Sequence, residues 1–450
     1  MFVSIKGGEF LERVVMRKTL CLRRLGERRG TQLGAGRFLA NPKVTAEQIV
    51  ASWPQRTAAA CAGRHVLAIE DASHIRFPTT ADRRRGLGPV KQGNVHGLMV
   101  HAVLAVDADS HACLGLVGGT VWNRPGVNPV SNKQRALDDR ESLHWLDGAR
   151  QAGVVLAQAA MVTVVADREA DMYALWAQGP ADNRHLLIRA TRDRALADGG
   201  RLYAAATEFA PAGVRRFTLP ARDPGKPKRD VVVELRYGEV EIRRPEQERD
   251  RALPASVRLR LIEVVEPEPR AAAKRGDEPI HWRLLTTHTI DDAEQAWRIV
   301  DWYRARWVIE QLFRAMKSQG LQLEDSQLAT AEGLRKLTAI AVKAACIDIQ
   351  LTQERDGCHK LPAGVVFSAP EIETIEALVP SLEGNTDKQK NPHRQGTLAR
   401  ASWVIARLGC WNCYGKPPGP ITFRRGMQQF YAIHRCRELE RRLKRDVRIP

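Results

Sequence analysis

The chain has 450 residues, and its 70 Lys and Arg residues outnumber its 52 Asp and Glu residues, which gives a formal net charge of +18. That excess favours a polyanionic partner, nucleic acid rather than a membrane surface. The sequence has no apolar run of the roughly 18 residues that a transmembrane helix needs, and the eight cysteines are scattered. We therefore expect a cytoplasmic protein with reduced thiols that binds DNA or RNA and no membrane.

Residues 1–60 predict a basic helical segment, and residues 61–190 predict an α/β fold that follows it. Thr45 and Gln48 have the spacing of a capping box at the start of a short helix in that segment. Short strands alternate with helices after residue 60, an order that suits a mixed sheet with helices on both faces. We expect strands at 65–71, 97–107, 112–122, 161–167 and 184–190, a hairpin between the second and third, and a helix at 138–160.

The character of the sequence changes after residue 190. Short β-type segments separated by Pro-rich and Lys-rich stretches fill 191–290, which predicts a β-rich insertion in the α/β domain. Residues 291–354 are helical in pattern, 379–397 are typical of a linker or long loop, and 398–447 predict helices with a very basic end.

Two of the predicted strands end on a carboxylate, Asp71 and Asp167. Carboxylates at the carboxyl ends of strands in an α/β sheet commonly lie in the ligand-binding crevice. Either residue alone fits a solvated strand end as well as a ligand. Two of them in a strongly basic chain favour a site for a hard cation.

A third group of charged residues lies in the predicted helix over 301–320. At roughly 100° per residue, Tyr303, Arg306, Glu310 and Lys317 share a stripe about 60° wide, with Arg314 beside it. A surface ladder of ion pairs would also explain this stripe, at only tenths of a kcal/mol for each pair. If Glu310 instead faces the two strand carboxylates, the three complete a two-metal site for phosphoryl transfer. Mg²⁺ suits such ligands, and the neighbouring cations would hold DNA phosphates.

The chain resembles the IS-four family of DDE insertion-sequence transposases. The signature Y-x2-R-x3-E-x6-K is complete, and DREAD and AIED hold the two strand carboxylates. DREAD covers residues 167–171 and AIED covers 68–71. Further matching segments are GRFLANPKVTAEQI (36–49), HWRLLTT (281–287) and SWVIARLG (402–409).

This resemblance implies a ribonuclease-H-like core with a β-rich insertion and helical N-terminal and C-terminal regions. The implied parts are an N-terminal DNA-binding region (1–60), the core (61–190 and 291–360), the insertion (191–290) and a C-terminal dimerisation region (361–450). Asp71, Asp167 and Glu310 would bind Mg²⁺, or Mn²⁺ in its place, and catalyse the reaction. The residues implied in DNA binding are Tyr303, Arg306, Arg314, Lys317, Arg189, Arg194 and Arg37. Trp282 would stack on a base flipped out of the duplex, although a buried strand aromatic also fits that position.

The implied activity is cut-and-paste transposition, in which one site nicks the element end, forms and opens a hairpin, and joins the end to target DNA. A homodimer would bridge two ends in the bacterial cytoplasm, at the nucleoid. Residues 1–33 match the family pattern poorly, so the alternatives are a divergent end-binding domain or a shortened copy that acts as a silent, dimerising inhibitor. A metal nuclease without strand transfer is a third possibility. Cys410 and Cys413 fit incidental thiols better than a zinc site, since no second pair accompanies them.

Overall fold

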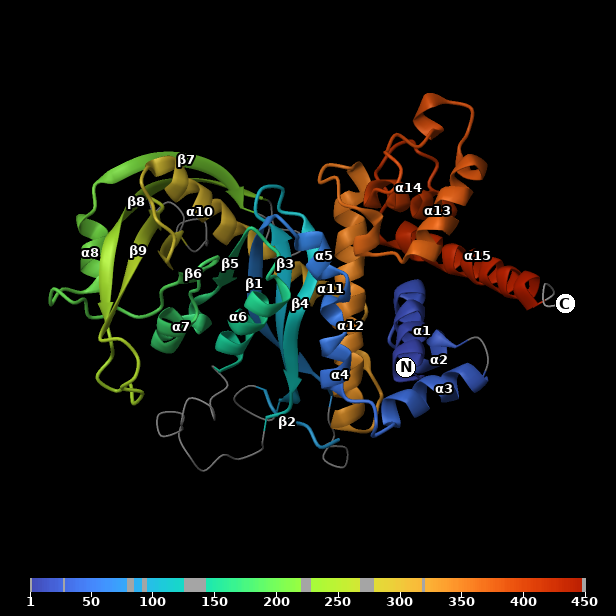
Figure 1. The fold of residues 1–450 in the computed structure, drawn as a ribbon, viewed down its shortest axis with the longest axis horizontal. Coiled ribbons are helices and arrows are strands. Elements are labelled where there is room, and N and C mark those ends of the chain that lie inside the picture. The colour runs from blue at the N-terminus through green and yellow to red at the C-terminus, as the bar shows by residue number, and fades with distance from the viewer. Residues whose placement is uncertain are drawn as a thin grey trace.

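We describe a computed structural model of the chain, which covers residues 2–26, 29–78, 85–90, 95–124, 143–219, 228–267, 279–317 and 320–446 (Figure 1). The first residues of the helix predicted at 138–160 lie outside these ranges. The strands are β1 (His65–Arg76), β2 (Gly88–Pro89), β3 (His96–Asp107), β4 (Cys113–Trp122), β5 (Met161–Ala166), β6 (Arg184–Arg189), β7 (Pro211–Leu219), β8 (Arg229–Arg243), β9 (Ser256–Val265) and β10 (His281–Thr286).

The helices precede, flank and follow these strands. They are α1 (Phe2–Arg17), α2 (Leu22–Leu25), α3 (Arg29–Ala40), α4 (Ala46–Ala51), α5 (Thr57–Cys61), α6 (Leu143–Val155), α7 (Tyr173–Gln178), α8 (Leu202–Glu208), α10 (Ala293–Ala305), α11 (Trp307–Met316), α12 (Ala331–Gln353), α13 (Ala369–Leu382), α14 (Leu398–Leu408) and α15 (Pro420–Asp446). The predicted capping box is present, because Thr45 and Gln48 exchange hydrogen bonds at the start of α4.

Five strands form the centre of the fold, in the spatial order β4-β3-β1-β5-β6. The hairpin strand β3 lies antiparallel to both β1 and β4, whereas β1, β5 and β6 run parallel to one another. This is the topology of a ribonuclease-H-like core, so the predicted α/β fold class is confirmed. The hairpin expected between residues 97 and 122 is also present, and its turn is closed by the Asp107 carboxylate, which accepts hydrogen bonds from the amides of Asp109 and Ser110.

Strand β1 is longer than its sequence suggests. We predicted that it would end at Asp71, but it continues to Arg76 because β3 pairs with it over its whole length. Its other neighbour, β5, pairs with it only as far as Glu70. Asp71 therefore lies in mid-strand, at the level where β5 has ended.

The segment predicted as a β-rich insertion continues the same sheet. Strand β10 pairs with β6, and β9, β8 and β7 follow it in that order towards the far edge. Within the described residues, all ten strands thus form one sheet, and this segment also holds the short helix α8. Figure 1 shows these strands curving away from the core.

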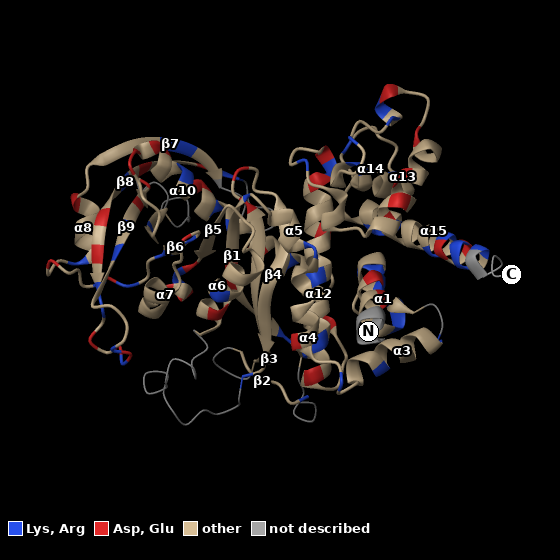
Figure 2. Cartoon of the chain, in the orientation of Figure 1, with Lys and Arg blue, Asp and Glu red and all other residues tan. Residues whose placement is uncertain are grey.

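The long helix α12 connects the sheet to the helical parts of the molecule. It packs on β4 and on α11, and on its other sides it contacts α1, α3, α4 and α14 (Figure 1). Lys and Arg are prominent at the end of α15, which projects from the body (Figure 2). In the described ranges, none of the helices is long and apolar enough to span a bilayer.

The signature segment is divided between two helices where we predicted one. The backbone amide of Arg306 donates to Tyr303 O (3.1 Å), and the amide of Ile309 donates to Arg306 O (3.1 Å). These i to i+3 bonds tighten the chain between α10 and α11. Tyr303 therefore lies on α10, Arg306 at the junction, and Glu310 on α11.

Candidate active site

Three carboxylates from distant parts of the chain meet at one guanidinium. Arg306 Nη1 donates to Asp71 Oδ2 at 3.0 Å, and Arg306 Nη2 donates to Glu310 Oε1 at 2.9 Å and lies 3.9 Å from Asp167 Oδ2. Asp71 is carried by β1, Asp167 directly follows β5, and Glu310 stands in the first turn of α11. The structure thus brings together the three residues that the sequence suggested as one site.

Local structure fixes each of these carboxylates. Asp167 caps the short 3₁₀ helix Arg168–Ala170, and its Oδ1 accepts a hydrogen bond from the Arg168 amide at 2.7 Å. Asp71 Oδ1 accepts a hydrogen bond from the Ala72 amide at 2.8 Å. Because one oxygen of each aspartate is held by backbone, the other is directed towards Arg306.

The electrostatics of the cluster show an excess of negative charge. Burial raises the pKa of Asp71 to about 6, although the Arg306 guanidinium opposes that rise. Burial likewise raises the pKa of Glu310, again against the effect of Arg306. Burial disfavours the charged form of Arg306, but the surrounding anionic groups outweigh it and raise the Arg306 pKa above its ordinary value. One guanidinium is therefore shared among three acids, and the burial of Asp71 and Glu310 makes further positive charge favourable beside those two.

The donor set fits a hard divalent cation. Carboxylate oxygens are the ligands that Mg²⁺ prefers, and a small number of them leaves places for water and phosphate. As the described side chains are placed, no three His, Cys, Asp or Glu residues surround a common metal position. Arg306 lies among the three acids and supplies the positive charge there.

One side of the cluster is aromatic and basic. The Tyr303 hydroxyl donates to Asp167 Oδ1 at 3.3 Å, and burial together with the charge of Asp167 raises the Tyr303 pKa to about 12. Trp282 packs edge-to-face on Tyr303, with ring centroids 5.5 Å apart. Arg189 lies close enough to Tyr303 for its charge to lower that pKa, and its Nη2 also donates to His281 O at 3.2 Å.

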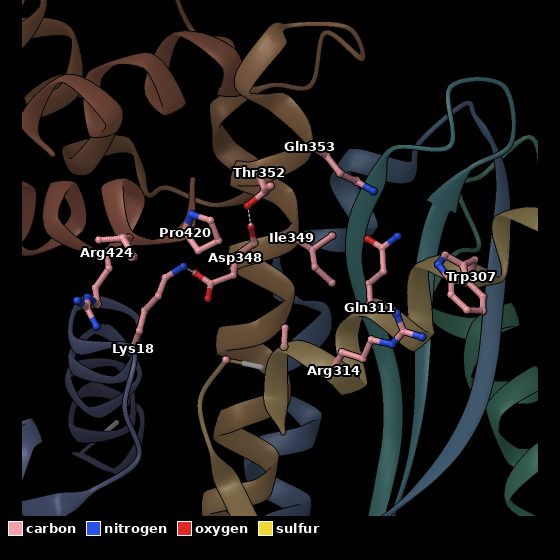
Figure 3. Close-up of a pocket in the computed structure, with 13 residues that line it drawn as sticks. Lys18, Trp307, Gln311, Arg314, Asp348, Ile349, Thr352, Gln353, Pro420 and Arg424 are labelled. Carbon is pink, nitrogen blue, oxygen red and sulfur yellow. Dashed lines mark hydrogen bonds and ion pairs between the residues drawn. The ribbon is translucent and has the colours of Figure 1, made fainter. Parts of the chain in front are cut away.

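The other side holds Lys317, the last residue of the signature, and Arg314. Lys317 Nζ donates to Ser73 Oγ at 2.8 Å. The Arg314 side chain extends towards Trp307, with Cζ 4.9 Å from the ring centroid (Figure 3). Arg314 and Trp307 line a cavity of about 520 Å³ between α11, α12 and the start of α15. Lys317 thus faces β1, whereas Arg314 faces a neighbouring cavity.

Two of the predicted DNA contacts lie elsewhere. Arg194 is buried, and its guanidinium donates to Asp171 Oδ1 and to the Asp171 carbonyl. Its Nε and Nη2 atoms are engaged with Asp171 in the interior, so the structure does not place Arg194 among the groups that contact Arg306 and the three acids. Arg37 is exposed on α3, outside the sheet that carries the acids.

Sequence reasoning missed the partners that hold the site in place. Asp171 accepts hydrogen bonds from Trp176 Nε1, from the Thr191 amide and from Arg194, and so ties the loop after Asp167 to the loop after β6. The fifth position of DREAD was the available signal for it. Ser73 could have been found only by recognising that β1 continues beyond Asp71.

A family model described as a transposase DDE domain matches residues 63–347. The chain belongs to the DDE transposase family. The matched segment runs from just before β1 into α12, so it includes Asp71, Asp167 and Glu310. Among solved structures, the chain is similar to piggyBac transposase in a synaptic complex with hairpin DNA, at 8% identity and a TM-score of 0.35 over 90% of this chain and 70% of that chain. The family match over residues 63–347 identifies the protein as a DNA transposase, and its central fold is the mixed α/β core described above.

Proposed function

We propose that Asp71, Asp167 and Glu310 are the catalytic triad of a metal-dependent, cut-and-paste DNA transposase. The observation that supports this most directly is their convergence on Arg306 from β1, the end of β5 and α11. Residues that distant in the sequence would not share one guanidinium by helical periodicity alone. A surface ladder of ion pairs would need only Arg306 and Glu310.

Mg²⁺ is the cofactor that we expect, with Mn²⁺ as a substitute, held by the oxygens of the same three acids. When bound, it would supply Lewis-acid activation of the attacking oxygen and stabilisation of the leaving oxygen. Arg306 must release at least one carboxylate for this. The freed guanidinium then lies beside the acids, where it can bind a DNA phosphate in bidentate fashion.

The neighbouring side chains hold the DNA in our proposal. Arg189 on one side and Lys317 on the other would neutralise backbone phosphates, and Arg314 would do so from the adjacent cavity. Tyr303 keeps its hydroxyl proton over the physiological range, because its pKa is about 12, so it orients Asp167 as a hydrogen-bond donor. Trp282 beside Tyr303 is placed to stack on an extruded base during hairpin formation.

The finer reaction scheme follows the resemblance to the IS-four family. Water nicks one strand at each element end, and the freed 3′-hydroxyl forms a hairpin with the opposite strand. Hydrolysis opens the hairpin, and the 3′-hydroxyl then attacks target DNA. We expect a homodimer to bridge the two ends, with the helices after residue 361 forming much of its contact.

The test uses purified full-length protein and a plasmid that carries the gene's own flanking DNA, with Mg²⁺ or Mn²⁺. Wild-type protein should excise the segment with hairpin ends, and the Asp167→Ala variant should bind the same DNA without cutting it. Cleavage that survives in Asp167→Ala, or that needs no divalent cation, would refute the proposed site. DNA binding and dimerisation without cleavage by the wild type would instead support a silent inhibitor.

A further inference from the structure

The part of β1 beyond Asp71 contacts the signature segment at successive levels. Asp71 contacts Arg306 at the start of α11, and Ser73 accepts a hydrogen bond from Lys317 at the end of α11. The Arg76 amide then donates at 2.9 Å to Glu324 Oε1, in the short 3₁₀ helix Leu323–Asp325 that follows. One strand thus holds this helix at its beginning, at its end and just after it.

We propose that Ser73 is a positioning residue for DNA binding, which holds the Lys317 ammonium at a fixed place beside the three acids. The inference rests on the proposed function, in which Lys317 neutralises a phosphate. Ser73 lies two residues after Asp71, so both side chains point to the same face of β1, roughly 7 Å apart along the strand. Lys317 is thereby set to hold a phosphate next to the one that reacts at the acids.

The hydroxyl suits this task because of its chemistry. Lys carries a compact charge on a flexible stem, and a bound phosphate must otherwise restrict that stem. Ser73 Oγ accepts one ammonium hydrogen, and an ammonium has three, so holding Lys317 in this way does not consume its charge. Preorganisation of this kind improves affinity by reducing the entropy lost on binding.

The backbone of Lys317 does not depend on Ser73. Its amide donates to Phe313 O at 3.1 Å, as the last part of α11, whose buried face packs in the core. Ser73 is itself only partly buried. Loss of the hydroxyl should therefore remove this constraint on the ammonium and leave the helix in place.

The test is a double-mutant cycle on full-length protein that carries Asp167→Ala, so that DNA is bound but not cut. Binding to duplex DNA is measured over a series of salt concentrations for Ser73→Ala, Lys317→Ala and the double variant. Lys317→Ala should flatten the salt dependence by about one phosphate contact. Ser73→Ala should weaken binding about tenfold when Lys317 is present and less than about twofold when it is absent.

The matched control is Ser73→Thr, which keeps a hydroxyl on the same strand face and should restore binding. Equal losses from Ser73→Ala with and without Lys317, or a loss that Ser73→Thr does not reverse, would overturn the positioning role. No effect of Lys317→Ala on affinity or on its salt dependence would refute the phosphate contact itself. Thermal unfolding of each variant separates these outcomes from misfolding.

Discussion

Two clusters of carboxylate and guanidinium each contain one aspartate of the DREAD segment, Asp171 in the first and Asp167 in the second, but they differ in exposure and in charge balance. In the pair Asp171–Arg194 the side chains are 0% and 4% exposed, and each acceptor oxygen of Asp171 has an N–H donor. Around Arg306 the side chains are 15–27% exposed, and three acids share one guanidinium. The first cluster is closed and neutral, and the second is open and short of positive charge.

The difference separates a group that holds the fold from a group that is prepared for a ligand. A buried ion pair in which both partners are hydrogen-bonded has little to gain from a further cation. Acids such as Asp71 and Glu310, whose pKa values are raised by burial, gain from any cation that reaches them. Proximity in sequence to Asp167 therefore does not show which charges do chemistry, whereas the balance of charge and exposure does.

The largest effect should come from removing charge at the open cluster. In Asp71→Asn or Glu310→Gln we expect cleavage to fall at least about a thousandfold, because an amide is a poor ligand for a hard cation and several kcal/mol of transition-state stabilisation are lost. DNA binding should stay within a few-fold, as measured by gel shift. Glu208→Gln, an exposed acid on α8, is the control. Cleavage within tenfold of wild type in Glu310→Gln would show that this acid is not catalytic.

The closed cluster should respond in stability. Asp171→Asn leaves Arg194 as a buried, unpaired charge, so we expect the free energy of unfolding to fall by about 3–5 kcal/mol. The matched control is Asp147→Asn, which breaks the exposed pair with Arg150 and should cost about 0–1 kcal/mol. Denaturant unfolding followed by circular dichroism measures both. Similar small losses in the two variants would remove the distinction between the clusters.

His288, a buried residue outside both clusters, should make the stability of the protein depend on pH. His288 hydrogen-bonds Thr163 at 2.8 Å and stacks on His185, and burial lowers the His288 pKa to about 3. The unfolded chain binds a proton near pH 6.5 and the folded chain does not, so stability falls as pH drops below about 6.5. Between pH 7 and pH 5 this residue should cost about 2 kcal/mol.

The variant His288→Gln tests that statement, since its amide can still reach the Thr163 hydroxyl but does not titrate in this range. Its free energy of unfolding should change less between pH 7 and pH 5 than that of wild type, by about 2 kcal/mol. An identical loss in both proteins would assign the acid sensitivity to other groups, of which His65 and His185 are the nearest candidates, because burial lowers their pKa values as well.

The sequence was sufficient for those features that local spacing controls. The hairpin of β3 and β4 and the strand that ends before Asp167 follow from runs of apolar residues with turn residues between them. The acids could be grouped because DREAD and the Y-x2-R-x3-E-x6-K spacing are matched without gaps. That Arg306 lies among the acids was not predicted, since helical periodicity relates Arg306 to Glu310 but says nothing of β1.

Other features depend on pairing between distant segments, which the sequence does not reveal. Residues 72–76 are partly polar, and only the length of β3 makes them a strand. The continuity of the sheet through β10 depends on its pairing with β6. Arg194 was expected to contact DNA because its segment resembles the family's, yet its side chain pairs with the buried Asp171 in the interior.

The smallest expected effect is on hairpin formation alone. It tests whether Trp282, on the aromatic side of the open cluster, takes part in the reaction. Trp282 is partly buried between Phe217 and Tyr303, with ring centroids 6.2 Å and 5.5 Å away. If it stacks on an extruded base, Trp282→Ala loses about 1–3 kcal/mol at that step alone. Hairpin yield should then fall about tenfold while nicked ends accumulate, as read on denaturing gels. Trp411→Ala, which removes a partly buried indole in the loop between α14 and α15, should leave both products unchanged. Equal loss of nicks and hairpins in Trp282→Ala would instead assign the indole to packing against Tyr303, because a structural defect reaches Asp167 and hence every step that the acids catalyse.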